Sequence, residues 1–150
     1  MILNELLTRQ NVFTKISLSD GEKELPKELK VKIMRIRMAY NKIRKAFDNE
    51  AQEFINELMT EEFRNLQQNN ERSEQEEKRY QELSRLIDSE YQEFLIQKGK
   101  EETSEIDDSF TVDEYSDILD INSSKAVEIN GNSIPAVDFM EIVYELFVKE

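Results

Sequence analysis

The carboxylates of the C-terminal third are the side chains whose type and density could do chemistry. A divalent cation prefers carboxylate oxygens, but the Asp-x-Asp-x-Asp-Gly loop is missing, so we expect no metal site. The same charges could mimic a phosphate backbone and occupy a basic groove on another protein. Mimicry of nucleic acid therefore stays open as an alternative function. The acidic residues are Asp107, Asp108, Asp113, Glu114, Asp117 and Asp120, and we take Asp113, Asp117 and Asp120 as candidate partner-binding residues.

Residues 23–45 form the opposite kind of segment, with nine basic and two acidic side chains, although the whole chain has a net charge of -13. Basic residues at helical spacing could contact phosphates, but the acidic remainder would repel nucleic acid. We therefore do not expect a nucleic-acid partner. We expect the basic side chains to pair with acidic residues of a neighbour, such as 101–120 of the same or another chain. Lys30, Arg35 and Arg37 are the candidate partner-binding residues of this segment.

Absent residue types exclude much catalytic chemistry. The chain has no cysteine and no histidine, which excludes thiolate nucleophiles, Cys or His zinc sites and a Ser-His-Asp triad. Carboxylate pairs such as Glu53 and Glu57 lie on a predicted exposed helix face with no apolar pocket to raise a pKa. We expect no enzymatic activity and no cofactor.

The composition indicates one mainly helical structural unit. The 150 residues include three glycines and two prolines, and 38% are hydrophobic. No apolar run reaches the roughly 18 residues of a transmembrane helix, and the first residues lack the pattern of a secretory signal. We therefore expect a soluble intracellular protein that does not contact a membrane.

A long helical hairpin is predicted over residues 23–102. Apolar residues recur in steps of three and four from Lys27 to about Asn69, which predicts one long amphipathic helix. A second helix is predicted over 71–102, ending near Gly99, and the two run antiparallel. Further apolar residues widen the face of the first helix, which predicts more than one packing neighbour. They are Val31, Met34, Met38, Ile55 and Met59.

Residues 1–22 are predicted to form an apolar arm, a short helix or an extended segment, that docks on the C-terminal cap. Leu3, Leu6, Leu7 and Phe13 carry much of its apolar character. Exposing them to water would be costly, since each buried apolar side chain contributes about 1.5–3 kcal/mol. We take these four as candidate partner-binding residues.

Residues 103–150 are predicted to form an acidic linker and a small α+β cap. Thr111 and Glu114 match a capping box at the start of a helix that runs to about Leu119. Asn130-Gly131 predicts a β-hairpin with a return strand at 132–134, followed by a final helix over 136–148. This last helix is apolar almost all round, which predicts burial against the hairpin or another chain. Its candidate partner-binding residues are Phe139, Val143 and Phe147.

The layout resembles small, functionally uncharacterised helical proteins encoded in the structural gene clusters of tailed bacteriophages. The resemblance rests on Leu25-Pro26-x-x-Leu29-Lys30-x-Lys32-Ile33 at the start of the basic helix and on the 126–129 strand before an apolar helix. It implies a virion or assembly component that contacts other subunits and assigns no catalytic residues. The implied location is the host cytoplasm, with incorporation into a virion as an option.

The leading prediction is a mainly α, non-enzymatic interaction or assembly protein. It has a long antiparallel helical hairpin and a small C-terminal α+β cap. Its predicted partners are proteins, either copies of itself or other virion subunits, because the arm and the final helix offer more apolar surface than one thin hairpin covers. The alternative is an acidic inhibitor that mimics nucleic acid and binds a host DNA-binding or defence protein.

Overall fold

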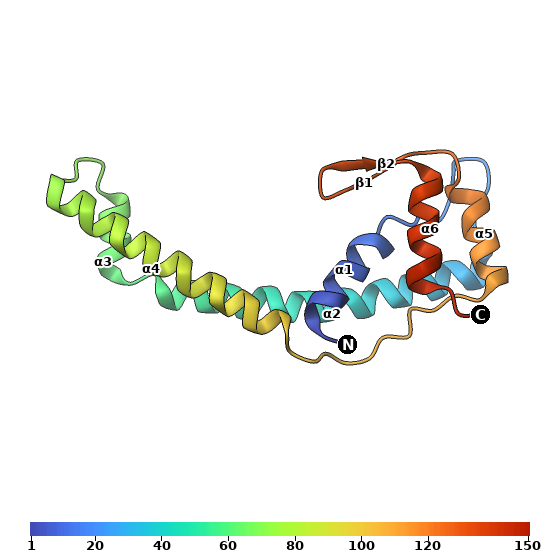
Figure 1. Cartoon of the computed structure of the whole chain (residues 1–150), viewed down its shortest axis with the longest axis horizontal. Coiled ribbons are helices and arrows are strands. Elements are labelled where there is room, and N and C mark those ends of the chain that lie inside the picture. Colours follow the sequence, from blue (N-terminus) through green and yellow to red (C-terminus); the bar gives the residue numbers. More distant parts are fainter. The chain divides into compact units, whose positions relative to one another are not determined.

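A computed structural model describes all 150 residues, of which 67% are helical. Six helices and one two-stranded antiparallel hairpin (Figure 1) confirm the mainly α fold with a small C-terminal β-hairpin and a final helix. The elements are α1 (Leu3–Phe13), α2 (Lys27–Leu58), α3 (Glu61–Gln68), α4 (Glu74–Gly99), α5 (Val112–Asn122), β1 (Val127–Ile129), β2 (Asn132–Ile134) and α6 (Ala136–Phe147).

The chain forms two compact units. The first unit comprises Met1–Ile43 and Glu102–Glu150, and the second comprises Arg44–Glu101. The first unit therefore combines both ends of the chain with the N-terminal part of α2. Residues 1–22 share a hydrophobic core with residues of the C-terminal cap.

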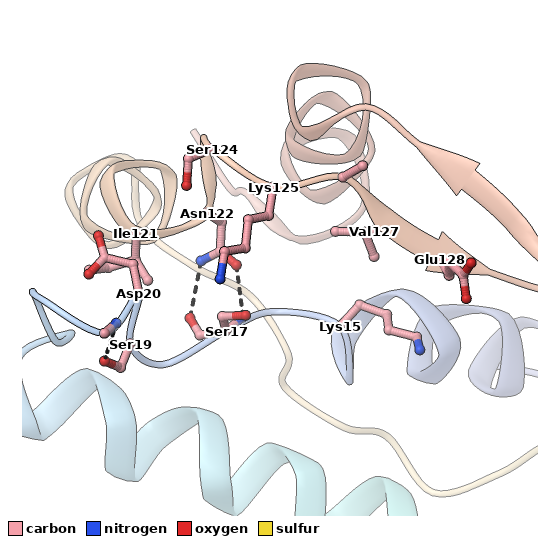
Figure 2. Close-up of a pocket in the computed structure, with 12 residues that line it drawn as sticks. Lys15, Ser17, Ser19, Asp20, Ile121, Asn122, Ser124, Lys125, Val127 and Glu128 are labelled. Carbon is pink, nitrogen blue, oxygen red and sulfur yellow. Dashed lines mark hydrogen bonds between the residues drawn. The ribbon is translucent and has the colours of Figure 1, made fainter.

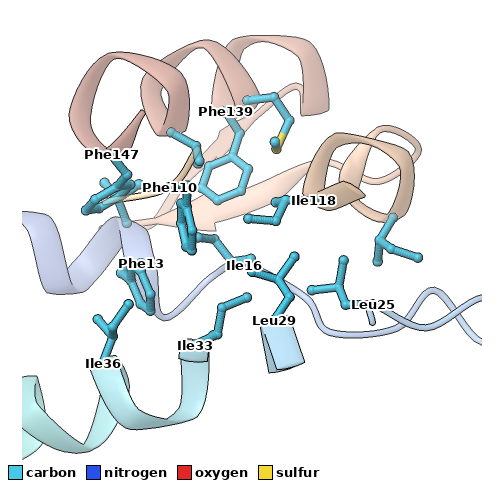
Figure 3. Packing of buried hydrophobic residues seen from close by; sticks show 14 of the residues in the cluster. Phe13, Ile16, Leu25, Leu29, Ile33, Ile36, Phe110, Ile118, Phe139 and Phe147 are labelled. Carbon is cyan, nitrogen blue, oxygen red and sulfur yellow. The ribbon is translucent and has the colours of Figure 1, made fainter. Parts of the chain in front are cut away.

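The core of the first unit is built around one face of α2. Leu29, Ile33, Ile36 and Tyr40 recur in steps of three and four, as an amphipathic helix requires, and all four are buried. Side chains from α1, α5, α6 and the connecting segments complete the cluster (Figure 3). Three rings meet there: Phe13 stacks on Phe110 at 5.7 Å between ring centres and meets Phe147 edge-on at 5.3 Å.

The acidic segment before α5 is held at both of its ends. The N-terminal ammonium lies 3.0 Å from a carboxylate oxygen of Glu102 and 3.1 Å from one of Glu105. At the other end, the Phe110 amide donates to the carbonyl of Phe147, and the Lys149 amide donates to that of Phe110. Ion pairs at one end and backbone hydrogen bonds at the other thus hold a segment whose composition is typical of a linker.

The C-terminal cap confirms its local sequence signals. Thr111 Oγ accepts a hydrogen bond from the Glu114 amide at 3.1 Å, while the Glu114 carboxylate accepts from the Thr111 amide at 2.9 Å. This capping box opens α5, which extends to Asn122, beyond the predicted end near Leu119. In the hairpin, Asn130 and Gly131 have φ of 52° and 79°, as a type I′ turn requires.

The second unit is a helical hairpin. Phe54 of α2 stacks on Phe94 of α4 at 4.3 Å between ring centres, and Glu50 pairs with Lys98. From Glu50 to Phe54 the chain advances four residues along α2, whereas their partners go back four residues along α4, from Lys98 to Phe94. The two helices therefore run antiparallel. Helix α3 adds a further stack, with Phe63 at 5.3 Å from Tyr80.

The predicted single helix to about Asn69 is wrong, because the chain breaks after Leu58. Thr60 adopts an extended conformation, and its side chain accepts a hydrogen bond from the Phe63 amide at 3.2 Å. Such a cap satisfies an orphan amide and starts a new helix. The second long helix likewise begins at Glu74 instead of Glu71, because Ser73 and Glu76 form a capping box.

Candidate interaction surface on helix α2

One face of α2 in the first unit is apolar, basic and exposed. We call it the outer face of α2; its members are Lys27, Val31, Met34, Arg35, Met38 and Lys42, all exposed. The exposed fraction is 39% for Val31, 53% for Met34 and 70% for Met38. Spacings of three and four place these three apolar side chains in one row on the helix.

The basic residues of this face lack partners within the chain. Lys27, Arg35 and Lys42 form no ion pair. Three other lysines of the basic segment do: Lys23 lies 3.4 Å from Asp120, Lys30 lies 3.0 Å from Glu24, and Lys32 lies 2.8 Å from Glu114. The expected pairing of the basic segment with residues 101–120 therefore occurs within the chain, but it leaves the outer face uncompensated.

A hydrogen-bonded network of Arg9, Tyr40 and Asp108 joins α2 to α1 and to the segment before α5. Tyr40 donates its hydroxyl proton to the carboxylate of Asp108, which also accepts two hydrogen bonds from Arg9, at 2.8 and 2.7 Å. Arg9 also donates to the Leu146 carbonyl at 2.8 Å. Because each group has partners, the buried charges are compensated.

The titration of this network follows from its contacts. Burial, reinforced by the hydrogen bond to Asp108, raises the pKa of Tyr40 well above its ordinary value. The hydrogen bonds from the Arg9 guanidinium to Asp108 raise the pKa of Arg9. Tyr40 is therefore a neutral donor and Arg9 a permanent cation, and we assign the network a structural role in holding α2 against α1 and the 102–110 segment.

Most of the apolar residues proposed for partner binding pack inside the first unit, which corrects their assignment. Their exposed fraction does not exceed 5%, because the arm forms helix α1 and packs with α6 in one core. Leu7 is half-buried against the same cluster. None of the fully buried side chains presents a surface to another protein. They are Leu3, Leu6, Phe13, Phe139, Val143 and Phe147.

The three basic candidates have different surroundings. Arg35 is exposed and belongs to the outer face, whereas Lys30 pairs with Glu24. Arg37 is half-buried and donates to the Ile16 carbonyl, while its Nε has no hydrogen-bond partner. Burial lowers the pKa of Arg37. Arg37 thus holds the segment that follows α1 instead of facing a partner.

The three acidic candidates lie on the exposed side of α5. Asp117 and Asp120 line a shallow cavity of about 550 Å³ together with Ser116, Leu119 and Ser123. Asp113 is exposed near the start of the same helix. No group of three or more carboxylates is arranged to hold a metal ion.

A second cavity, of about 480 Å³, lies between the segment after α1 and the segment after α5 (Figure 2). Asn122 joins the two walls: its Oδ1 accepts from the Ser17 amide at 2.8 Å, and its Nδ2 donates to the Ser17 carbonyl at 3.1 Å. Lys15 and Lys125 at the rim are balanced by Asp20 and Glu128. The rim therefore has no net charge to select an ion.

Val31, Met34 and Met38, which are predicted to pack against neighbouring elements, are exposed to solvent instead. Their positions on a helical projection contained the signal, since they lie on the far side from Leu29, Ile33 and Tyr40. Met140 of α6, in contrast, is buried, with 1% exposed. Hydrophobic type alone did not distinguish a core methionine from a surface one.

No helix of this chain is both long enough and apolar enough to cross a membrane. No protein-family model, curated protein or solved structure matches the chain.

Proposed function

We propose that this chain is a non-enzymatic assembly protein that self-associates through the outer face of α2. The observation that carries the proposal is the row formed by Val31, Met34 and Met38, which is exposed and flanked by unpaired basic side chains. Flexible methionine side chains adapt well to a partner surface. The unpaired cations favour a partner whose surface is acidic, which is the character of most of this chain.

An accessory role in bacteriophage virion assembly belongs to this proposal. It rests on the resemblance of the layout to products of phage structural gene clusters. A subunit that repeats in an assembly needs surfaces that contact other subunits and no catalytic group, and the outer face of α2 would supply one.

The test is the molar mass in solution, measured by size exclusion with light scattering at about 50 mM and about 500 mM salt, because salt screens charges at these concentrations. We expect a species of two or more 17.8 kDa chains at low salt and a smaller mass at high salt. A variant with both Met34→Ser and Met38→Ser should be monomeric at both salts.

Val137→Ser is the matched control, because Val137 is 67% exposed on α6, outside the outer face. It should leave the mass unchanged. A wild-type monomer at both salts, or an oligomer that survives both methionine substitutions, would overturn the proposal.

The second candidate function, mimicry of nucleic acid, is supported by the exposed side of α5. Asp113, Asp117 and Asp120 follow one another in steps of four and three beside a shallow cavity. A mimic would bind a basic nuclease or DNA-binding protein with an affinity that falls steeply as salt rises. Binding of such a protein to the wild type, lost when all three aspartates become asparagine, would favour this function over assembly.

A further inference from the structure

We propose that the outer face of α2 binds the exposed side of α4 in a second copy of this chain, an inference that rests on the proposed function. The outer face of α4 consists of Glu82, Leu86, Glu90, Glu93 and Ile96, all exposed. It is the acidic counterpart of the outer face of α2.

The apolar content of the α4 face supports this pairing. Leu86 and Ile96 are each 55% exposed, although the other side of the same helix packs within the second unit through Tyr80, Ile87 and Phe94. More than half of the surface of each of these two residues therefore remains uncovered within the chain. Burying them against Met34 and Met38 of another copy would remove apolar area from water on both helices.

The charges on the two faces are complementary and unused. Glu90 and Glu93 form no ion pair, and Glu82 makes only a 3.7 Å contact with Arg79 of its own helix. On α2, Lys27, Arg35 and Lys42 are unpaired as well. Opposite charges that lack partners within the chain favour a contact between chains and set which faces meet.

Pairing of the α2 face with the same face of another copy is disfavoured. It would bury the methionines equally well, but it would place the cations of one helix beside those of the other. Like charges at an interface without counter-charges cost free energy. The acidic α4 face has no such conflict with α2.

The lengths of the two faces also agree. Residues 27–42 span about 22 Å of helix and residues 82–96 about 21 Å, at 1.5 Å per residue. Helix α5 is a poorer partner, because it has only 11 residues and two of its acids, Glu114 and Asp120, already pair with Lys32 and Lys23. Helix α6 exposes a single large apolar residue, Val137. Among the acidic helices, α4 offers the best match.

Charge reversal on each face tests the pairing in the full chain. Arg35→Glu with Lys42→Glu should raise the dissociation constant of self-association at least about tenfold, and Glu90→Lys with Glu93→Lys should do the same. All four substitutions in one chain restore opposite charges and should return the constant to within about threefold of wild type. Sedimentation equilibrium at low salt measures the dissociation constants of the wild type and of the three variants, and circular dichroism verifies that each variant is folded.

The outcomes separate this inference from the proposed function. If reversal on α2 weakens self-association while reversal on α4 does not, the α2 face is used but its occupant is not α4, and the inference fails. If neither reversal has an effect, the proposed function fails too. Failure of the fourfold variant to recover, with its helix content intact, would also overturn the pairing.

Discussion

The two units of the chain are stabilised by different means. The first unit encloses a continuous cluster in which Phe13, Tyr40, Phe139 and others are fully buried. The second unit buries few large side chains, chiefly Phe63 and Ile87, and relies on ring stacks and surface ion pairs such as Arg79 with Glu62. Surface ion pairs contribute little and are screened by salt.

The two units also differ in how firmly they support their exposed helix faces. The first unit presents the outer face of α2 on a helix whose opposite face packs in a core, so the helix backbone that carries the exposed row is held in place. In the second unit the exposed face of α4 belongs to a thinner structure with fewer buried contacts, and local opening costs less free energy in such regions.

The largest effect is expected from Phe13→Ala. Phe13 is fully buried and contacts three other rings, so the substitution should reduce the free energy of unfolding by about 4 kcal/mol through lost burial and a cavity. Urea denaturation followed by circular dichroism measures the loss. Phe13→Leu, which retains most of the volume, should cost much less; equal losses would contradict a tightly packed site.

Asp108→Ala should follow, with a loss of about 3 kcal/mol, because it leaves the partly buried Arg9 guanidinium without its carboxylate. The Tyr40 hydroxyl also loses its acceptor. Chemical denaturation gives the value, and Asp107→Ala is the control, since Asp107 is exposed and contacts only Ser109 through hydrogen bonds. Similar losses for the two aspartates would show that the network does not support the first unit.

Phe94→Ala tests the second unit with a comparable change. Phe94 is half-buried and stacks on Phe54, so we expect a loss of about 2 kcal/mol, smaller than for Phe13. Hydrogen exchange should show faster exchange within residues 44–101 and unchanged protection around Ile33 and Phe139. Uniform acceleration in both units would mean that they unfold together.

The smallest effect is expected from Tyr40→Phe, at about 1 kcal/mol near neutral pH for one lost hydrogen bond. Its pH dependence is more diagnostic. Since the pKa of folded Tyr40 is raised above the ordinary 10.0, its contribution is complete below pH 10 and is lost as the pH rises further. Unfolding measured from pH 8 upward should therefore show a shallower alkaline decline in Tyr40→Phe; an identical decline would exclude Tyr40 as its source.

Local signals in the sequence were reliable where neighbouring residues decide the outcome. The capping box at Thr111 and the Asn130-Gly131 turn formed as predicted, because each requires only residues within a few positions. The break at Thr60 is also local, but a sustained apolar period through 58–66 masked its capping signal. Periodicity indicates that a helix exists, and capping decides where it stops.

The sequence by itself determined the mainly helical fold, the β-hairpin, the basic and acidic segments and the absence of cysteine and histidine chemistry. Only the tertiary structure decided which apolar residues are enclosed: Phe139 and Phe147 are buried, whereas Met34 and Met38 are exposed. The physical reason is that burial depends on contacts between residues far apart in the chain. Helical spacing orders side chains around one axis, but it does not state which side of that axis the rest of the protein covers.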